Sequence, residues 1–251
     1  MPKSRISLTI EDKLLDKINN EAEQKSKNRS QLVEDIVNNY FDRKGLSTAM
    51  VLCGDEENKT LRLYKGKPVI SHILDQLEKE GIKRAVLLVG KNKDKLEPHF
   101  GSQYKNIALE YVEEDKLEGA AKALKEVRKK INETALVVNG HVISDVDIQD
   151  MLRTHKESQK PATISLTTVE DPSSYGVVEL KGNEIEGFSE KPRKGSEPSR
   201  LINAGTYIFE PEIFELLNNF NELNSLFGHL AAETRLTGYI YGGEWKDIQE
   251  D

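Results

Sequence analysis

The sequence predicts an α/β protein in two parts, a short strand–helix–helix segment and a larger domain with a mixed, mostly parallel sheet. Two observations support this prediction. Residues 5–41 show period-two hydrophobicity and then two helical stripes, whereas residues from 48 onward alternate short apolar runs with amphipathic segments. Alternating strands and helices are typical of a sheet covered by helices on both faces. We therefore expect domains at residues 1–45 and 48–251.

Composition excludes several classes of protein. The chain has 251 residues, of which 37% are hydrophobic and 31% charged, and no apolar run approaches the ~20 residues of a membrane span. The N-terminus lacks a long apolar segment, so we expect a cytoplasmic protein without a membrane partner. A single cysteine, Cys53, excludes an internal disulfide framework and a cysteine-rich zinc site.

Charge is distributed unevenly along the chain. The formal net charge of −7 is the wrong sign for a protein that coats nucleic acid over its whole surface. Residues 1–44 nevertheless hold 9 Lys or Arg against 8 Asp or Glu, whereas the remainder holds 27 against 35. The two parts therefore differ in electrostatic character, which suggests two tasks.

The first part begins with a half-buried strand. Residues 5–10 alternate between apolar and polar side chains, and helical stripes follow at residues 14–22 and 32–41. Asn28 is placed as the N-cap of the second helix, with Gln31 three residues later to complete a capping box. The strand carries Ile6, Leu8 and Ile10 on one face and Arg5, Ser7 and Thr9 on the other.

One strand and two helices are too few for a stable monomer. The strand has no partner within this segment, and about forty residues enclose a very small core. Pairing of two strands from two copies, with four helices packed on the ribbon, resolves both problems. We therefore expect a homodimer or a higher homo-oligomer.

Residues 3–43 resemble the ribbon-helix-helix DNA-binding domain of the Arc/MetJ type. The resemblance rests on the strand–helix–helix pattern, the basic strand start and the Asn-Arg-Ser helix entry. It implies double-stranded DNA as a partner, with the polar ribbon face in the major groove and the second helix's N-terminus on a backbone phosphate. The alternative is a dimerisation segment with a solvated polar strand face. The implied DNA-binding residues are Arg5, Ser7 and Thr9 on the ribbon, and Asn28, Arg29 and Ser30 at the helix entry.

The second part alternates strands and helices in order. Ligands of such sheets bind outside the carboxyl ends of the strands, so we expect a site in the segments after Cys53, Asn139 and Val169. The expected strands are residues 48–53, 84–89, 107–112, 135–139 and 162–169, and the expected helices are residues 68–80, 118–131 and 146–158.

Six ordered strings from residue 48 to the C-terminus resemble the sugar-1-phosphate nucleotidyltransferases, such as glucose-1-phosphate thymidylyltransferases and mannose-1-phosphate guanylyltransferases. The resemblance implies a Rossmann-like, GT-A-like fold and a sugar phosphate or nucleotide sugar as ligand. The strings are Gly-Lys-Pro at 66–68, Asn-Gly-His at 139–141, Asp-Pro-Ser-Ser-Tyr-Gly-Val-Val at 171–178, Glu-Lys-Pro at 190–192, Leu-Ile-Asn-Ala-Gly at 201–205 and Trp-Lys-Asp-Ile at 245–248.

The same resemblance implies the ligand-binding residues. Gly176 would let the sugar approach the backbone, Glu190 would accept hydrogen bonds from hydroxyl groups, and Lys191 would pair with the phosphate. An alternative is that the two glycines are needed only for turns and strand starts. The remaining implied residues are Asn203 and Gly205 in the sugar pocket, Gly119 in a base-binding turn, and His141 and Asp247 in the polar part of the site.

Two departures from the family pattern predict that the chain is not an enzyme. Asp55, Glu56 and Glu57 replace the glycine-rich, basic phosphate loop after the first strand. His141 replaces an aspartate that helps to hold magnesium in the family, and imidazole is a poor ligand for that ion. His141 and Asp247 could hold zinc, but two ligands without a third do not make a typical site. We therefore expect no catalytic residue, no metal and no cofactor.

Three functions remain open. The favoured one is a DNA-binding transcriptional regulator whose catalytically inactive domain senses a sugar phosphate or nucleotide sugar, or mediates assembly. The second is an active sugar-1-phosphate nucleotidyltransferase with a dimerising N-terminal extension. The third is an assembly platform that binds no ligand.

Overall fold

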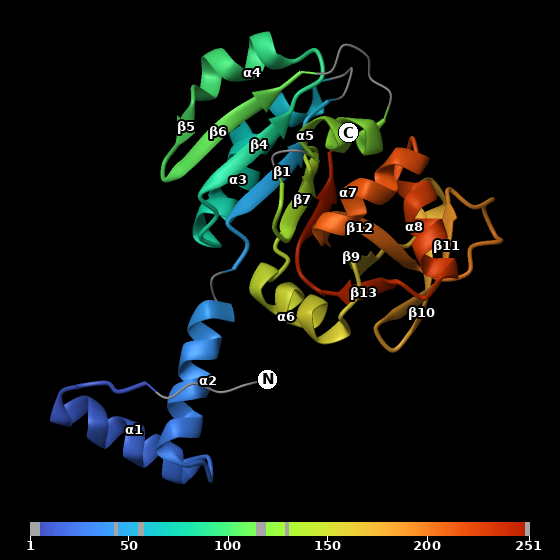
Figure 1. Ribbon diagram of the computed structural model, residues 1–251. Coiled ribbons are helices and arrows are strands. Elements are labelled where there is room, and N and C mark those ends of the chain that lie inside the picture. Colours follow the sequence, from blue (N-terminus) through green and yellow to red (C-terminus); the bar gives the residue numbers. More distant parts are fainter. Residues whose placement is uncertain (1–5, 43–44, 55–57, 114–118, 129–130, 249–251) are drawn as a thin grey trace. The chain divides into compact units, whose positions relative to one another are not determined.

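The computed structural model describes residues 6–42, 45–54, 58–113, 119–128 and 131–248 (Figure 1). The chain divides into two compact units, Met1–Gly45 and Leu46–Asp251, and each is considered by itself. None of the described helices has the length and apolar character required to cross a membrane.

The N-terminal unit contains two helices, α1 (Asp12–Gln24) and α2 (Arg29–Asp42). A reciprocal capping box starts α2: the backbone N–H of Asn28 donates to Oε1 of Gln31 at 2.9 Å, and the backbone N–H of Gln31 donates to Oδ1 of Asn28 at 2.9 Å. Two backbone donors at the helix start are thereby satisfied. The expected helix entry is confirmed.

The strand expected in the N-terminal unit is not formed in the single chain. Residues 6–10 have no strand assignment, because a strand needs a ladder partner and the described residues of this unit supply none. Two apolar residues of the helices, Ala22 and Leu32, are buried. Much of the apolar surface expected in a core is instead exposed, at Ile6, Leu8, Ile10, Leu14, Ile36 and Val37.

The second unit is built on a mixed sheet, as expected from the sequence. In spatial order its strands are β10-β11-β13-β9-β12-β7-β1-β4-β6-β5. The strands β7, β1, β4 and β6 are mutually parallel, whereas β12 runs antiparallel between β7 and β9. The bounds are β1 Thr48–Leu52, β4 Arg84–Leu88, β5 Gln103–Tyr104, β6 Ile107–Val112, β7 Ala135–Asn139, β9 Ala162–Thr168, β10 Gly176–Lys181, β11 Glu184–Glu190, β12 Leu201–Phe209 and β13 Leu236–Ile240.

Two short strand pairs lie outside this sheet. The strands β2 (Leu63–Tyr64) and β3 (Lys67–Pro68) form one antiparallel pair. The strands β8 (Val142–Ser144) and β14 (Trp245–Asp247) form the other. The second pair matters for the site, because it fixes the chain directly after β7 against the C-terminal segment.

Helices cover both faces of the sheet (Figure 1). Alternate residues of the parallel strands point into two different cores, Ala49 and Val51 into one and Met50 into the other. The first core includes side chains of α3 (Val69–Lys79), α4 (Lys93–Phe100) and α6 (Ile148–Ser158). The second includes side chains of α5 (Ala120–Val127), α7 (Pro211–Leu216) and α8 (Leu223–Ala232). Burial on both faces explains why these strands are continuous apolar runs in the sequence.

Candidate functional site

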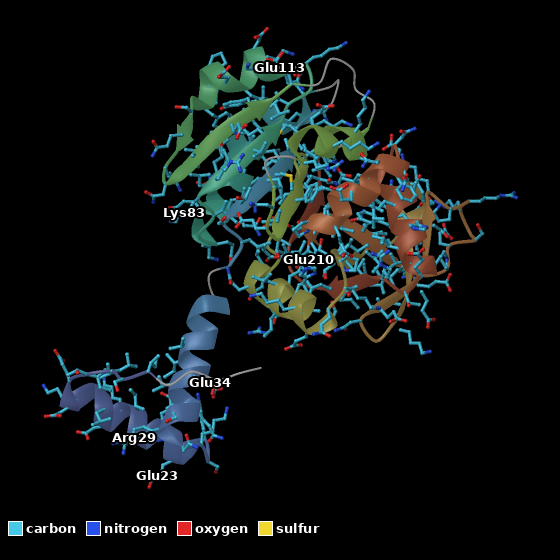
Figure 2. The ribbon with its side chains drawn as sticks, in the orientation of Figure 1. Glu23, Arg29, Glu34, Lys83, Glu113 and Glu210 are labelled. Carbon is cyan, nitrogen blue, oxygen red and sulfur yellow. The ribbon has the colours of Figure 1, made fainter. Side chains whose placement is uncertain are left out.

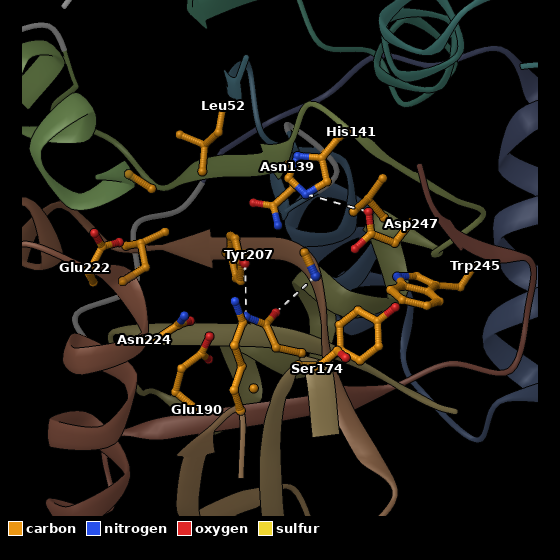
Figure 3. A pocket seen from close by; sticks show the side chains of 18 of the residues that line it. Leu52, Asn139, His141, Ser174, Glu190, Tyr207, Glu222, Asn224, Trp245 and Asp247 are labelled. Atoms are coloured by element: carbon orange, nitrogen blue, oxygen red, sulfur yellow. Dashed lines mark hydrogen bonds and ion pairs between the residues drawn. The ribbon is translucent and has the colours of Figure 1, made fainter. Parts of the chain in front are cut away.

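A cavity of about 410 Å³ opens where β1 and β7 end (Figure 3). Leu52 and Asn139 are the last residues of these two strands and are register partners. Because β12 is antiparallel to β7, its early residues reach the same edge: Thr206 pairs with Val138, which places Gly205 beside Asn139. The mixed topology therefore gathers polar side chains from distant segments around one cavity.

An irregularity in β12 shapes this edge. The pairing of β12 with β9 shifts between Asn203 and Tyr207, and such bulges redirect side chains. Gly205 has φ +82°, and a Cβ atom there would lie 2.8 Å from Nδ2 of Asn139, so glycine is required. Its N–H donates to Oδ1 of Asn203 at 3.0 Å, and Nδ2 of Asn203 donates to the hydroxyl of Tyr207 at 3.1 Å. The Asn203 side chain is therefore held in a fixed orientation.

The second wall comes from the β10–β11 pair. Gly176 is the register partner of Glu190, and a Cβ atom at Gly176 would lie 2.5 Å from Cζ of Phe188 and 3.1 Å from Oε2 of Glu190. Lys191 follows with φ +43°, and its N–H donates to the carbonyl of Tyr175 at 3.0 Å. The left-handed turn places Glu190 and Lys191 on the cavity lining together.

Burial and neighbouring charge alter two ionisable groups of the cavity. Burial raises the pKa of Glu190; the charge of Lys191 opposes this rise and that of Glu222 adds to it. Burial also raises the pKa of the Tyr207 hydroxyl to about 12, so that hydroxyl keeps its proton at neutral pH. A ligand that donates hydrogen bonds to Glu190 would favour its ionised form.

Aromatic rings form a third side of the cavity. The rings of Tyr175 and Trp245 meet edge to face, with centroids 5.4 Å apart and planes at 77°. The indole Nε1 of Trp245 donates to the carbonyl of Ala204 at 3.1 Å, which ties β14 to the irregular part of β12. Rings held in this way offer rigid apolar surface to a bound ligand.

His141 and Asp247 lie at the polar end of the cavity (Figure 3). Nε2 of His141 is 4.0 Å from Oδ1 of Asp247, and the side chains are 19% and 10% exposed. This donor set does not fit magnesium, which prefers oxygen ligands. No group of three or more His, Cys, Asp or Glu side chains within the described part of the chain is placed to hold a metal ion.

Seven of the eight residues implied as ligand contacts line this one cavity. The exception is Gly119, which is the N-cap of α5 with φ +99°; its neighbour Ala120 reaches the cavity instead. Asp55, Glu56 and Glu57 lie outside the described residues. The seven lining residues are His141, Gly176, Glu190, Lys191, Asn203, Gly205 and Asp247.

The cavity also includes residues that the sequence analysis did not single out. Glu222 and Asn224 stand at the start of α8 and line the cavity, but no recognisable string surrounds them. The cavity lining also includes Leu52, Asn139, Ser174, Tyr175 and Trp245. Their positions at strand ends or within the quoted strings could have identified them from the sequence.

The implied DNA-binding residues fall in the N-terminal unit. Arg29 and Ser30 are exposed in the first turn of α2, where Figure 2 labels Arg29. Ser7 and Thr9 are exposed, and Arg5 lies outside the described residues. A helix N-terminus with a nearby guanidinium is suited to contact a phosphate group.

Comparison with family models divides the chain into the same two parts. Residues 50–248 match the model "Nucleotidyl transferase", and residues 4–44 match the model "Ribbon-helix-helix protein, copG family". Among solved structures, a putative glucose-1-phosphate thymidylyltransferase from Bacillus anthracis has a TM-score of 0.71 at 22% identity, covering 80% of this chain and 89% of its own. A UDP-glucose pyrophosphorylase has a TM-score of 0.70 at 22% identity, covering 81% and 93%. Both likenesses confirm the fold.

Curated relatives are more similar in sequence. The bifunctional protein GlmU of Methanococcus maripaludis strain C7 is 30% identical over 212 residues, covering 81% of this chain and 49% of the relative. Mannose-1-phosphate guanyltransferase beta-A of Xenopus laevis is 33% identical over 199 residues, covering 76% and 55%. The chain thus spans about half the length of the curated relatives it matches.

These relatives overturn one expectation from the sequence. Their names are those of enzymes, and the expectation that this chain is not an enzyme is therefore wrong. That expectation gave too much weight to the acidic residues 55–57 and to His141, which change the charge of two loops. His141 itself lines the cavity, together with Gly176, Glu190, Lys191 and Asn203.

Proposed function

The chain belongs to the nucleotidyl transferase family and carries a ribbon-helix-helix domain at its N-terminus, and we propose that it transfers a nucleotidyl group to a sugar 1-phosphate and binds double-stranded DNA as a homodimer. One observation supports the first activity most strongly. Glu190 and Lys191 come from one string and Asn203 from another, and all three line a single cavity at the ends of β1 and β7. That cavity is the place where an α/β sheet of this kind binds its ligand.

The proposed reaction exchanges one phosphoanhydride bond for another. A phosphate oxygen of the sugar 1-phosphate attacks the α-phosphorus of a nucleoside triphosphate, the bond to the β-phosphate breaks, and pyrophosphate leaves. Lys191 pairs with the sugar phosphate, and Glu190 accepts hydrogen bonds from sugar hydroxyls. Asn203 donates hydrogen bonds to polar groups of the sugar ring or accepts hydrogen bonds from them. Catalysis then depends mainly on positioning and on neutralising charge.

Pyrophosphate release tests this activity directly. The full-length chain is incubated with glucose, mannose or N-acetylglucosamine 1-phosphate and each nucleoside triphosphate, with magnesium, manganese or cobalt chloride. At least one pair is expected to release pyrophosphate, and Glu190→Gln should reduce the rate, because the amide accepts fewer hydrogen bonds. Glu186→Gln is a matched control on the same strand, where Glu186 pairs with Lys181. Absence of release from every combination would contradict the proposal.

DNA binding and dimerisation are supported by the N-terminal unit. The exposed apolar residues at Ile6, Leu8 and Ile10 alternate with polar ones, as expected for a ribbon whose apolar face packs on helices and whose polar face is free. A second copy of the same segment supplies the missing strand partner and covers the apolar surface. The domain makes this chain a candidate transcriptional regulator.

Two arginines are expected to contribute to DNA binding in different ways. Arg5→Ala should reduce discrimination between operator and unrelated DNA by about 1–3 kcal/mol for each half-site, because a bidentate contact to a base is lost there. Arg29→Ala should weaken binding to all sequences and reduce the salt slope by about two for the homodimer, because each copy loses a phosphate contact.

Titrations of operator and unrelated duplexes at several salt concentrations distinguish these effects. Lys25→Ala is the control, because Lys25, the C-cap of α1, pairs with Glu21 and faces no proposed DNA contact. If Arg5→Ala leaves the ratio of specific to unspecific affinity unchanged, the assignment of the ribbon face to the base edges is wrong.

A further inference from the structure

The side chain of Tyr207 lines the cavity, although no motif in the sequence indicated it (Figure 3). We propose that the Tyr207 hydroxyl donates a hydrogen bond to a sugar hydroxyl oxygen of the ligand, and that Tyr207 thereby contributes to the choice of sugar. The inference rests on the proposed function for the identity of the ligand as a sugar phosphate, but ligand binding can be measured without turnover.

Packing gives the Tyr207 hydroxyl a fixed position. Tyr207 is only 2% exposed, and its ring stacks on that of Phe209 with centroids 5.7 Å apart and lies 5.2 Å from that of Phe227. Its backbone pairs with Val137 of β7 and Ile164 of β9, directly after the register shift in β12. Replacing Tyr207 with phenylalanine therefore removes one oxygen atom and keeps the ring that packs in the core.

Hydrogen bonding within the chain leaves the proton of this hydroxyl for a ligand. Nδ2 of Asn203 donates to the Tyr207 oxygen at 3.1 Å, and Asn203 is oriented for this role because its Oδ1 accepts from the N–H of Gly205. Burial raises the pKa of the hydroxyl to about 12, whereas the side chains of Asn203 and Asn139 lower it, as donors to the oxygen do. The proton thus stays on the oxygen at neutral pH, and no group in the described part of the chain accepts it.

The neighbouring carboxylate indicates which kind of group accepts this proton. Glu190 lies close enough for its charge to act on the Tyr207 hydroxyl, and both residues line the cavity. A hydroxyl group both donates and accepts, so one sugar hydroxyl can donate to Glu190 and accept from Tyr207. An ammonium group only donates, and a deoxy position does neither. Such ligands leave the buried Tyr207 proton unpaired, which a site of this kind penalises.

Calorimetric titration of the full-length chain with glucose, mannose and N-acetylglucosamine 1-phosphate tests the contact without catalysis. Tyr207→Phe should raise the dissociation constant of the sugar phosphate that binds by about 3- to 10-fold, because one hydrogen bond is lost. Tyr239→Phe is the matched control: the Tyr239 hydroxyl donates to Oδ2 of Asp150 at 2.8 Å, and Tyr239 is not part of the cavity lining. The control should bind as tightly as the parent, and equal affinity in the parent and Tyr207→Phe would overturn the proposal.

Two further comparisons distinguish a direct contact from an effect transmitted through Asn203. In an Asn203→Ala chain, Tyr207→Phe should still weaken binding, whereas no further loss would show that the hydroxyl acts only by orienting Asn203 and would contradict the contact. Monodeoxy analogues of the bound sugar phosphate leave the protein unchanged. One analogue should bind the parent more weakly and should bind the parent and Tyr207→Phe about equally; a parent that keeps its advantage over Tyr207→Phe with every analogue would also exclude the contact.

The titrations separate this contact from the transferase activity on which it builds. If the parent binds none of the three sugar phosphates, the ligand assigned to Tyr207 is wrong and the contact is excluded. If binding follows the expected pattern and no pyrophosphate is released, the Tyr207 contact stands and only the proposed transferase activity fails.

Discussion

Replacing Lys191 with methionine is expected to lower kcat/KM for the sugar 1-phosphate by about 10²- to 10³-fold, comparable to the loss of one charge-stabilising donor in other transferase and hydrolase sites. Lys191 and its neighbour Glu190 line the cavity together, and Lys191 is the cation that we assign to the phosphate. Methionine keeps most of the side-chain stem and meets the same backbone constraint at φ +43°. The folded chain should therefore retain its melting temperature while losing activity.

The matched control for this substitution is Lys194→Met. Lys194 lies three residues later, is largely exposed and pairs with Asp171, so its charge should contribute little to the cavity. Steady-state pyrophosphate release by the parent and the two variants distinguishes the assignments. Equal losses in both variants would show that general positive charge, and not the Lys191 ammonium group, accounts for phosphate binding.

Substituting Leu8 with lysine is expected to dissociate the N-terminal dimer. Burial of a leucine side chain contributes about 1.5–3 kcal/mol, and a symmetric dimer loses this contribution twice. The dimer dissociation constant should therefore rise by about 10²- to 10⁴-fold, and operator binding should fall with it. Sedimentation velocity over a range of protein concentrations measures the first effect, and a DNA titration measures the second.

Leu63→Lys controls for the insertion of a charge at an exposed leucine. Leu63 is 72% exposed and Leu8 is 64% exposed in the single chain, so the two sites differ little in exposure and differ in their expected partner. Leu63→Lys should leave the oligomeric state unchanged. A Leu8→Lys chain that sediments like the parent at every concentration would exclude the ribbon as the dimer interface.

The parallel strands β1, β4, β6 and β7, together with β9, could be predicted closely from the sequence. The expected strands 107–112 and 135–139 coincide with β6 and β7, and those at 48–53, 84–89 and 162–169 end one residue early in the structure. These strands contain dense apolar runs because at least part of each is buried by helices or neighbouring strands. The capping box of α2 could be predicted equally well, since it depends on two residues three positions apart.

The rest depends on contacts between distant segments. Nothing local in residues 201–205 indicates that β12 would run antiparallel between β7 and β9, or that its register would shift at the cavity. Glu222 reaches the cavity from the residue before α8, with no motif around it. The strand expected at residues 5–10 is absent from residues 6–10 of the single chain, and in the dimer that we propose its pairing partner belongs to another molecule.

Substituted motif residues also gave the wrong functional expectation. His141 and the acidic residues after β1 change the electrostatics expected at a phosphate site, and that change led to the interpretation that the chain is inactive. Replacement of one motif carboxylate by His141 does not by itself establish inactivity, and the enzyme names among the relatives contradict that interpretation.

If the strand is completed only by a second molecule, as we propose, the two domains respond differently to dilution. Occupancy of the cavity by a small ligand depends on ligand concentration alone, because that domain contains its own core. Formation of a paired ribbon rises with the square of the protomer concentration while most chains are single. Halving the amount of protein in a cell would then halve its catalytic capacity but reduce operator occupancy about fourfold. The abundance of this chain would thus control its operator occupancy independently of the substrate concentration.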